Sequence, residues 1–278
     1  MVSNTEIQNI DEITEENLEV VARMIGQTDR PTTSAGSGLP RLAIEQDTEN
    51  DSGATLPKGQ YRVRSGDHTF HVKSPVVRFF VRYFAYDLWN AENPEDSIRS
   101  VMKASLRDEF PDSSGGMKSG KLSKKEAETL TPNSIEAAKQ KLIKTTQVIY
   151  GIIHEGVGVT VDGEEQDLKG TPFIYSARGS AYVPVSDHIK KLGSRKIMFS
   201  ILTKLATQRH KNGAVVYYSP VLIEGDTVKI DSKDMEQLKL FFEDIEKYNS
   251  RILKSYNEHQ KAVLTSEELD IDRELEVA

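Results

Sequence analysis

Hydrophobic and polar residues alternate most regularly over residues 76–88, which read VVRFFVRYFAYDL. Because successive side chains of a strand point to opposite faces of the sheet, this alternation predicts a long β-strand. One predicted face carries residues that suit a core, namely Val77, Phe79, Val81, Tyr83 and Ala85. The opposite face carries Arg78, Phe80, Arg82, Phe84 and Tyr86.

This second face suits neither a core, which would bury two arginines, nor plain solvent, which would expose three rings. Single-stranded nucleic acid matches it, because phosphates bind cations and unpaired bases stack on aromatic rings. We therefore interpret the strand as part of a nucleic-acid interface. The alternative is an ordinary strand whose arginines pair with acids or extend their charged ends to water.

Shorter apolar runs between turn sequences predict a body made mainly of strands. Ser65-Gly66-Asp67 and Asn212-Gly213 are turn sequences that predict two β-hairpins. The predicted strands are 60–64, 69–73, 76–88, 146–153, 158–161, 171–178, 196–210, 214–223 and 228–230.

Apolar residues at helical spacing predict a long helix over residues 233–264, with Asp231 or Ser232 as its N-cap. This helix packs on the sheet or on a copy of itself, and the second case makes the protein a homo-oligomer. The shorter predicted helices are 10–25, 97–110, 135–144 and a single turn at 187–192.

Composition divides the chain into four parts. Residues 1–55 are predicted to be an acidic, partly disordered leader, and residues 56–232 form the main domain. Residues 111–134 are rich in Gly, Ser and Lys and are expected to be a mobile loop of that domain. The helix 233–264 and an acidic tail, 265–278, complete the chain.

The net charge of −7 hides a segregation of the charges. Residues 1–53 carry a net charge of −8 and residues 264–278 one of −5, whereas residues 54–263 carry +6. A basic body between acidic ends is typical of a polyanion-binding domain whose ends repel or mimic the polyanion. The alternative is that the acidic ends only maintain solubility.

Several classes of protein are excluded or disfavoured by the composition. The chain has no cysteine, which excludes disulfides, thiol catalysis and cysteine-ligated zinc. No apolar run is long enough for a transmembrane helix, and the acidic N-terminus is unlike a signal peptide. We expect a cytoplasmic protein, in the host cytoplasm if it is viral, that does not act at a membrane.

Residues 115–122, GGMKSGKL, nearly match a phosphate-binding loop. The motif requires Ser or Thr after its lysine, where this chain has Leu122, and an apolar strand before it. A loop that contacts a nucleic-acid backbone is the better functional interpretation, and a plain loop is the alternative. The six histidines form no metal-binding motif and no nucleophile elbow is present, so we expect no cofactor, no metal and no catalytic residue.

A second region combines aromatic residues and cations within residues 172–184, PFIYSARGSAYVP. Its alternative interpretation is a set of core aromatics. With the basic residues around it, this region extends the candidate nucleic-acid interface, whose members outside the strand are Lys73, Lys118, Lys121, Tyr175, Arg178, Tyr182, Lys196 and Lys204.

The arrangement resembles the single-stranded DNA-binding proteins that phages and bacteria use in replication. The shared features are the basic and aromatic strand face, the Gly/Lys-rich loop at 113–125 and the acidic C-terminal tail. The resemblance implies an OB-fold barrel and a tail that recruits replication proteins such as a polymerase or helicase. The tail residues concerned are Glu267, Glu268, Asp270, Asp272, Glu274 and Glu276.

The chain departs from that family in two ways. Bacterial members end in an acidic tip with Asp and Phe, whereas this chain ends in Glu276-Val277-Ala278, so recruitment of the same host partners does not follow. It also lacks the zinc ligands of some phage relatives.

We therefore expect an α+β protein with a mostly β core, built as an elaborated OB-like β-barrel with a long C-terminal helix and flexible acidic ends. Its expected function is non-enzymatic, sequence-tolerant binding of single-stranded DNA in phage DNA replication, recombination or repair. The second hypothesis is a phage structural or transcription-modulating factor that binds proteins only. The third is a nucleic-acid enzyme that depends on NTP or metal.

Overall fold

The computed structural model describes residues 38–90, 93, 96–193 and 196–277, with side chains described as far as residue 263. The helix expected at 10–25 lies outside the described residues. The strands are β1 (Arg41–Ile44), β2 (Tyr61–Ser65), β3 (His68–Val72), β4 (Val76–Leu88), β5 (Ile98–Arg99), β6 (Ile143–Glu155), β7 (Val157–Val159), β8 (Glu165–Asp167), β9 (Pro172–Ala177), β10 (Ile201–Asn212) and β11 (Val215–Thr227). The helices are η3 (Lys118–Gly120), α2 (Lys124–Ala127), α3 (Ile135–Leu142), η4 (Gly179–Ala181), α4 (Tyr182–Leu192), η5 (Met198–Ser200) and α5 (Ser232–Val277).

The eleven strands of the described residues form one sheet in the order β11-β10-β4-β6-β9-β1-β2-β3-β7-β8, with β5 paired to the end of β4. β1 runs parallel to β9, and the other pairs are antiparallel. The prediction of an α+β protein with a mostly β core and a long C-terminal helix is confirmed.

The sheet is open, so the strands do not close into the barrel that the expected OB-like fold would form. The side chain of Gln46 takes the place of a missing strand pairing: its amide donates to the Tyr218 carbonyl and its oxygen accepts from the Tyr218 N–H, both at 2.9 Å. The Tyr61 hydroxyl also donates to the Ala206 carbonyl at 3.1 Å. Side chains rather than a backbone ladder therefore link the β10–β11 hairpin to β2 and to the segment after β1.

A β-bulge in β4 interrupts the alternation on which the sequence prediction depended. Phe79 pairs with Gly151 and Val81 pairs with Tyr150, so Phe80 has no partner on β6. In such a bulge two successive residues share one face, and Phe80 and Val81 indeed pack in the same hydrophobic cluster. Gly151 suits the site because a Cβ there would lie 2.6 Å from both the Phe173 ring and the Arg78 carbonyl oxygen.

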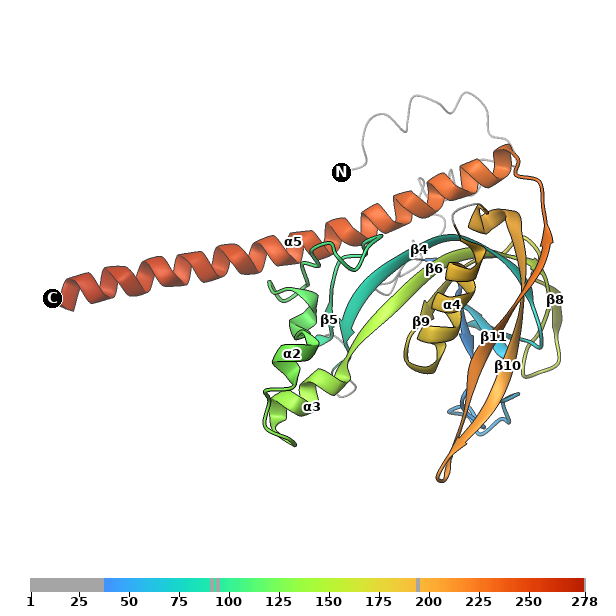
Figure 1. Cartoon of the computed structure of the whole chain (residues 1–278), viewed down its shortest axis with the longest axis horizontal. Coiled ribbons are helices and arrows are strands. Elements are labelled where there is room, and N and C mark those ends of the chain that lie inside the picture. Colours follow the sequence, from blue (N-terminus) through green and yellow to red (C-terminus); the bar gives the residue numbers. More distant parts are fainter. Residues whose placement is uncertain (1–37, 91–92, 94–95, 194–195, 278) are drawn as a thin grey trace, which may run out of the picture. The chain divides into compact units, whose positions relative to one another are not determined.

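The two faces of the sheet bury separate hydrophobic clusters. On the concave face, Val185 of α4 packs with Phe79 and Phe173. On the convex face, Phe241 and Ile245 of α5 pack with Phe80. Figure 1 shows β4 and β6 arching between these helices, with α5 along the outside of the arch and α4 inside it.

Several segments differ from the prediction. Residues 41–44, expected in the leader, form an interior strand, because β1 pairs with both β9 and β2. The expected helix at 97–110 is β5 and turns, and residues 228–230 are not a strand. Residues 111–134, expected to be a loop, contain η3 and α2. The turn expected at 187–192 is the end of α4.

The C-terminal helix is longer than predicted and runs through the expected acidic tail to Val277. Asp231 is its N-cap: its carboxylate accepts from the Asp234 N–H at 3.0 Å, and the Asp234 carboxylate accepts from the Asp231 N–H at 3.1 Å. Such reciprocal bonds satisfy amides that a helix start leaves free. No helix in the described part of the chain is long and apolar enough to cross a membrane.

Candidate nucleic-acid interface

The bulge divides the predicted binding face of β4 between the two sides of the sheet. Arg78 and Phe80 lie on the convex side, against η5 and α5. Arg82, Phe84 and Tyr86 lie on the concave side, where the last two pack with Ile143. The prediction that these five residues share one face is therefore wrong, because one unpaired residue inverts the alternation after Phe80.

Arg78 and Phe80 hold α5 to the sheet. The Arg78 guanidinium donates to the Phe199 carbonyl at 2.8 Å and to the Asp234 carboxylate at 2.7 Å. The Phe80 ring stacks on Phe199, with centroids 4.9 Å apart, and meets Phe241 edge-on at 5.6 Å. Neither side chain is placed to contact a ligand.

Phe84 and Tyr86 are each only 9% exposed, so the base stacking predicted for them would require rings that are already packed. Their faces instead support cations. The Arg82 guanidinium lies 5.1 Å from the Phe84 ring centroid, and the Lys118 Nζ lies 5.9 Å from that of Tyr86. Both cations are half-buried on the concave side and keep donors available for an anion.

Arg82 occupies an unusual environment for a guanidinium. Burial lowers its pKa, while the nearby Tyr182 hydroxyl acts in the opposite direction. Among the residues described, Arg82 makes no ion pair with a carboxylate. Beside it, the amide of Gln147 donates to the Tyr182 carbonyl at 2.7 Å and fixes the start of α4. The result is a partly desolvated, unneutralised cation on the floor of the concave face.

Lys118 is positioned by a left-handed turn. Lys118 and Ser119 both have φ of 55°, and Gly120 has φ of 77°. A non-glycine residue in this region costs free energy, so surrounding contacts must hold it. Here the buried Asp112 carboxylate accepts from the Ser119 N–H at 2.8 Å, and the Ser119 hydroxyl donates to the Tyr86 carbonyl at 3.0 Å.

The same Asp112 carboxylate accepts from the Gly116 N–H at 2.9 Å. Two backbone amides of the segment that nearly matches a phosphate-binding loop therefore donate to Asp112 and are not free to bind a phosphate. Asp112→Ala should lower the free energy of unfolding by about 1–3 kcal/mol, because the buried N–H of Ser119 would lose its acceptor. Urea denaturation measures this. Asp108→Ala, at an exposed carboxylate nearby, is the control and should change stability by less than about 0.5 kcal/mol; equal effects would contradict the role of Asp112.

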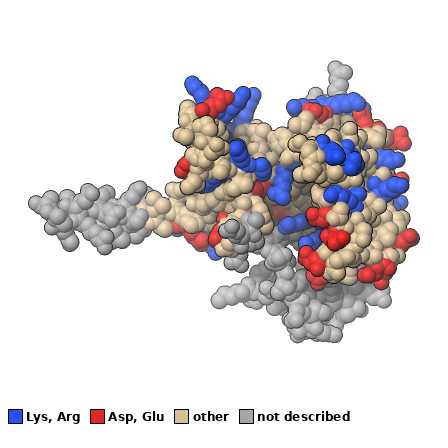
Figure 2. Space-filling model, turned by 90° about the horizontal axis from the view of Figure 1, so that it is seen from below, with Lys and Arg blue, Asp and Glu red and all other residues tan. Residues whose placement is uncertain are grey.

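A cavity of about 680 Å³ opens between the α2–α3 segment and β6. Lys121, Lys141 and Lys144 line it together with Thr145, which pairs with Tyr86 across the sheet. Figure 2 views the concave side from below and shows Lys and Arg side chains gathered on both sides of a hollow. We call this surface the concave groove and define it by Arg82, Lys118, Lys141 and Tyr182.

Lys121 has a partly structural role, since its Nζ donates to the carbonyls of Gln140 and Ile143 at 2.8 and 3.3 Å. Burial and the neighbouring Lys144 both lower the pKa of its amine. Its ammonium therefore completes the end of α3 while it adds positive charge to the cavity wall.

The other predicted binding residues lie apart from the concave groove. Lys196 pairs with Glu224, and Lys73 and Lys204 are exposed elsewhere on the body. Tyr175 is buried, and its hydroxyl has no hydrogen-bond partner among the described residues. Arg178 follows Ala177 in extended conformation and lies near Asp87 on the convex side, where its charge opposes the effect of burial, which raises the Asp87 pKa. The six tail acids lie in the last turns of α5.

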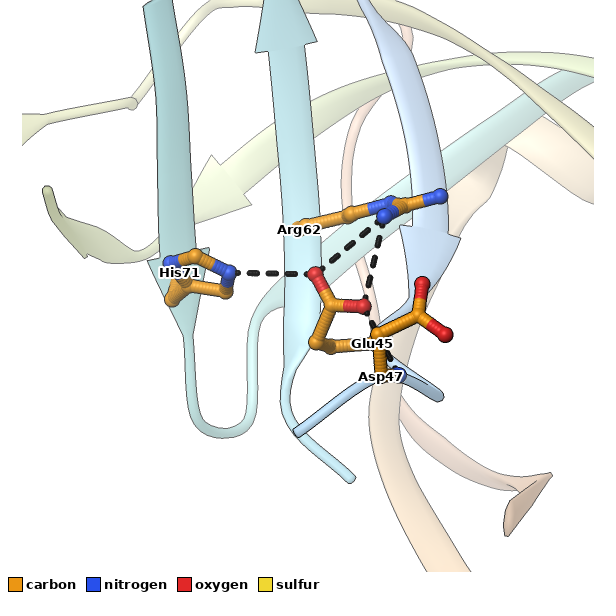
Figure 3. Close-up of polar contacts among 4 residues, drawn as sticks. All are labelled: Glu45, Asp47, Arg62 and His71. Atoms are coloured by element: carbon orange, nitrogen blue, oxygen red, sulfur yellow. Dashed lines mark hydrogen bonds and ion pairs between the residues drawn. The ribbon is translucent and has the colours of Figure 1, made fainter. Parts of the chain in front are cut away.

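A second polar cluster lies on the convex side of β1–β3 (Figure 3). The Glu45 carboxylate, 1% exposed, accepts from Arg62 Nη1 at 3.2 Å, contacts His71 Nε2 at 3.3 Å and accepts from the Asp47 N–H at 3.1 Å. Burial alone would raise the pKa of Glu45, but these partners outweigh it and hold the pKa below its usual 4.5.

The lowered pKa of Glu45 predicts acid sensitivity. A carboxyl group with a lower pKa in the folded state stabilises the fold above its unfolded pKa and loses this contribution as the pH falls through the folded value. Glu45→Gln should therefore be less stable than wild type at neutral pH, and the gap should narrow below pH 4.5. Denaturant titrations between pH 7 and pH 3 measure it; a constant gap over that range would contradict the prediction.

Sequence reasoning missed Asp112, Gln147 and the lysines of the α3–β6 junction. Asp112 is the second residue of the turn sequence PDSSGG, which is a typical signal for a carboxylate that caps a loop. Gln147 has no such signal, because its role depends on the distant Tyr182. In the described ranges, no group of three or more His, Asp or Glu side chains is placed to hold a metal ion.

Comparison of the chain with protein-family models, with curated proteins and with solved structures gives no match. The geometry of the groove and the sequence together are therefore the basis for a functional conclusion.

Proposed function

We propose that this protein binds single-stranded nucleic acid, DNA in the first place, along the concave groove and catalyses no reaction of its own. The single observation that carries the proposal is Arg82, a half-buried guanidinium that makes no ion pair with the residues described around it. Lys118 on Tyr86 and the lysines of the neighbouring cavity extend the same positive surface.

The energetic argument starts from desolvation. Partial burial of a cation is unfavourable unless an anion or a π-face compensates. Phe84 and Tyr86 supply the π-faces but no negative charge. A phosphodiester backbone supplies that charge at repeated spacing, and it binds guanidinium and ammonium groups through charge-assisted hydrogen bonds.

The positions of the aromatic rings change which residues are expected to stack on bases. Tyr182, half-buried at the wall of the groove, is available to a base, whereas Phe80, Phe84 and Tyr86 are packed. Trp89, which follows the end of β4, is 48% exposed and is a further candidate. Stacking on such rings contributes about 1–3 kcal/mol per base and tolerates any sequence.

The wider role remains part of the same proposal. The strongly curved sheet is consistent with an elaborated OB-like fold, although it is open rather than closed. The resemblance to phage and bacterial single-stranded DNA-binding proteins favours replication, recombination or repair of phage DNA in the cytoplasm of a host. The acidic residues 267–276 would then contact replication proteins or compete with DNA for the groove.

The proposal is tested by the binding of fluorescein-labelled dT30, measured by fluorescence anisotropy across a salt series with duplex DNA as the control. We expect binding to the single strand that weakens as salt rises, together with much weaker binding to duplex. Absence of binding at low salt would refute the proposal and favour the hypothesis of a protein that binds only proteins.

A further inference from the structure

The convex face of β1 and β2 carries three arginines that the concave groove does not include. Arg41 pairs with Arg64 across the two strands, and Arg62 pairs with Ala43 two residues away along the same face. Arg41 also lies beside Ile174 of β9, which packs on the α5 side of the sheet. We call these three residues the outer arginine patch.

The pair formed by Arg41 and Arg64 is unfavourable on its own. Side chains directly opposite on antiparallel strands have Cβ atoms about 5 Å apart, and like charges at that spacing repel. Both arginines are exposed, and neither forms an ion pair within the part of the chain that the structure describes. The repulsion is relieved when an anion binds between them.

Arg62 differs from this pair because a buried acid fixes its position. Nη1 donates to both oxygens of Glu45 at 3.2 and 3.3 Å, while the side chain stays 39% exposed. Figure 3 shows the guanidinium above the carboxylate, with one terminal nitrogen directed away from it. Since His71 also contacts Glu45, the carboxylate is fully engaged and leaves the charges of Arg41 and Arg64 uncompensated.

We propose that the outer arginine patch binds closely spaced phosphate groups, those of a nucleic-acid backbone, as a second contact surface on the opposite side of the sheet from the concave groove. The inference rests on the proposed function for its ligand. Guanidinium groups present paired donors that match two phosphate oxygens. A nucleic-acid strand that leaves the groove and passes over this face makes phosphate contacts that a nucleic-acid strand confined to the groove lacks.

The test uses the double variant Arg41→Gln/Arg64→Gln in the full chain. Arg62 is kept, because its loss would leave the buried Glu45 carboxylate without its main partner and destabilise the fold. The matched control is Lys73→Gln/Lys204→Gln, which removes two exposed charges outside both surfaces. In dT30 binding, the slope of log K against log salt should fall by about 1.4 for the arginine variant, since each lost phosphate contact contributes about 0.7. An unchanged slope would overturn the inference while leaving the proposed function intact.

A second measurement separates this inference from the proposed function. Inorganic tripolyphosphate, which offers closely spaced phosphates without a nucleic-acid chain, should raise the melting temperature of wild type and of the lysine control more than that of the arginine variant, which keeps only the concave groove. If wild type shows this shift and yet does not bind dT30, the proposed function fails and the patch stands as a site for free oligophosphate. If tripolyphosphate shifts the arginine variant as much as wild type, the patch is not the site.

Discussion

Phe80→Ala should lower the free energy of unfolding by about 3–5 kcal/mol, the usual cost of removing a buried phenylalanine ring. The side chain is 5% exposed and lies between Phe199 and Phe241, so its loss leaves a cavity under α5. Urea denaturation followed by circular dichroism measures the change. Under conditions where the variant stays folded, its affinity for single-stranded DNA should equal that of wild type.

The control for this experiment is Phe242→Ala on the same helix. Phe242 is 40% exposed and directly follows the buried Phe241, so its replacement should cost less than about 1 kcal/mol. A stable Phe80→Ala variant with selectively weakened DNA binding would show that the ring stacks on bases, as the alternating pattern alone suggested. That result would contradict the packing of α5 over the Phe80 ring.

The double variant Arg82→Gln/Lys118→Gln should weaken binding to dT30 and reduce its salt dependence. Both cations lie on aromatic rings of the concave side, and each is expected to contact one phosphate. The slope of log K against log salt should therefore fall by about 1.4. Because a cation–π contact contributes only about 0.5–2 kcal/mol, the variant should remain folded.

Lys73→Gln/Lys204→Gln serves as the matched control, since it removes the same charge at two exposed positions that sequence reasoning had also assigned to the interface. We expect its slope and affinity to stay close to those of wild type. Equal losses in the two double variants would indicate binding through net charge alone, without a defined groove.

Local patterns in the sequence predicted most of the strands. The strand predicted over residues 76–88 has the same bounds as β4, and the turn predicted at Asn212-Gly213 lies one residue later, at Gly213 and Ala214 between β10 and β11. The apolar spacing of residues 233–264 predicted most of α5, and Asp231, one of the two expected N-caps, caps it. In each of these elements the spacing of apolar residues or the turn residues within a short stretch of chain is enough to predict the secondary structure.

The features that define the site arise from long-range packing. The bulge at Phe80 lies opposite Tyr150 and Gly151, where the Phe173 ring approaches closely, and these three residues are far from β4 in the sequence. Its effect is large, because a single unpaired residue sends Arg78 to α5 and Arg82 to the groove. Likewise, β1 has only four residues and is recognisable as a strand only beside β9 and β2.

The central claim is that single-stranded DNA lies in the concave groove, and ultraviolet crosslinking of dT30 followed by peptide mapping tests it most directly. We predict crosslinked peptides that contain Tyr182 and the segment around Lys118, whether or not the outer arginine patch is also labelled. Bound dT30 whose crosslinks fall only on α5 or on the β10–β11 hairpin would contradict the claim.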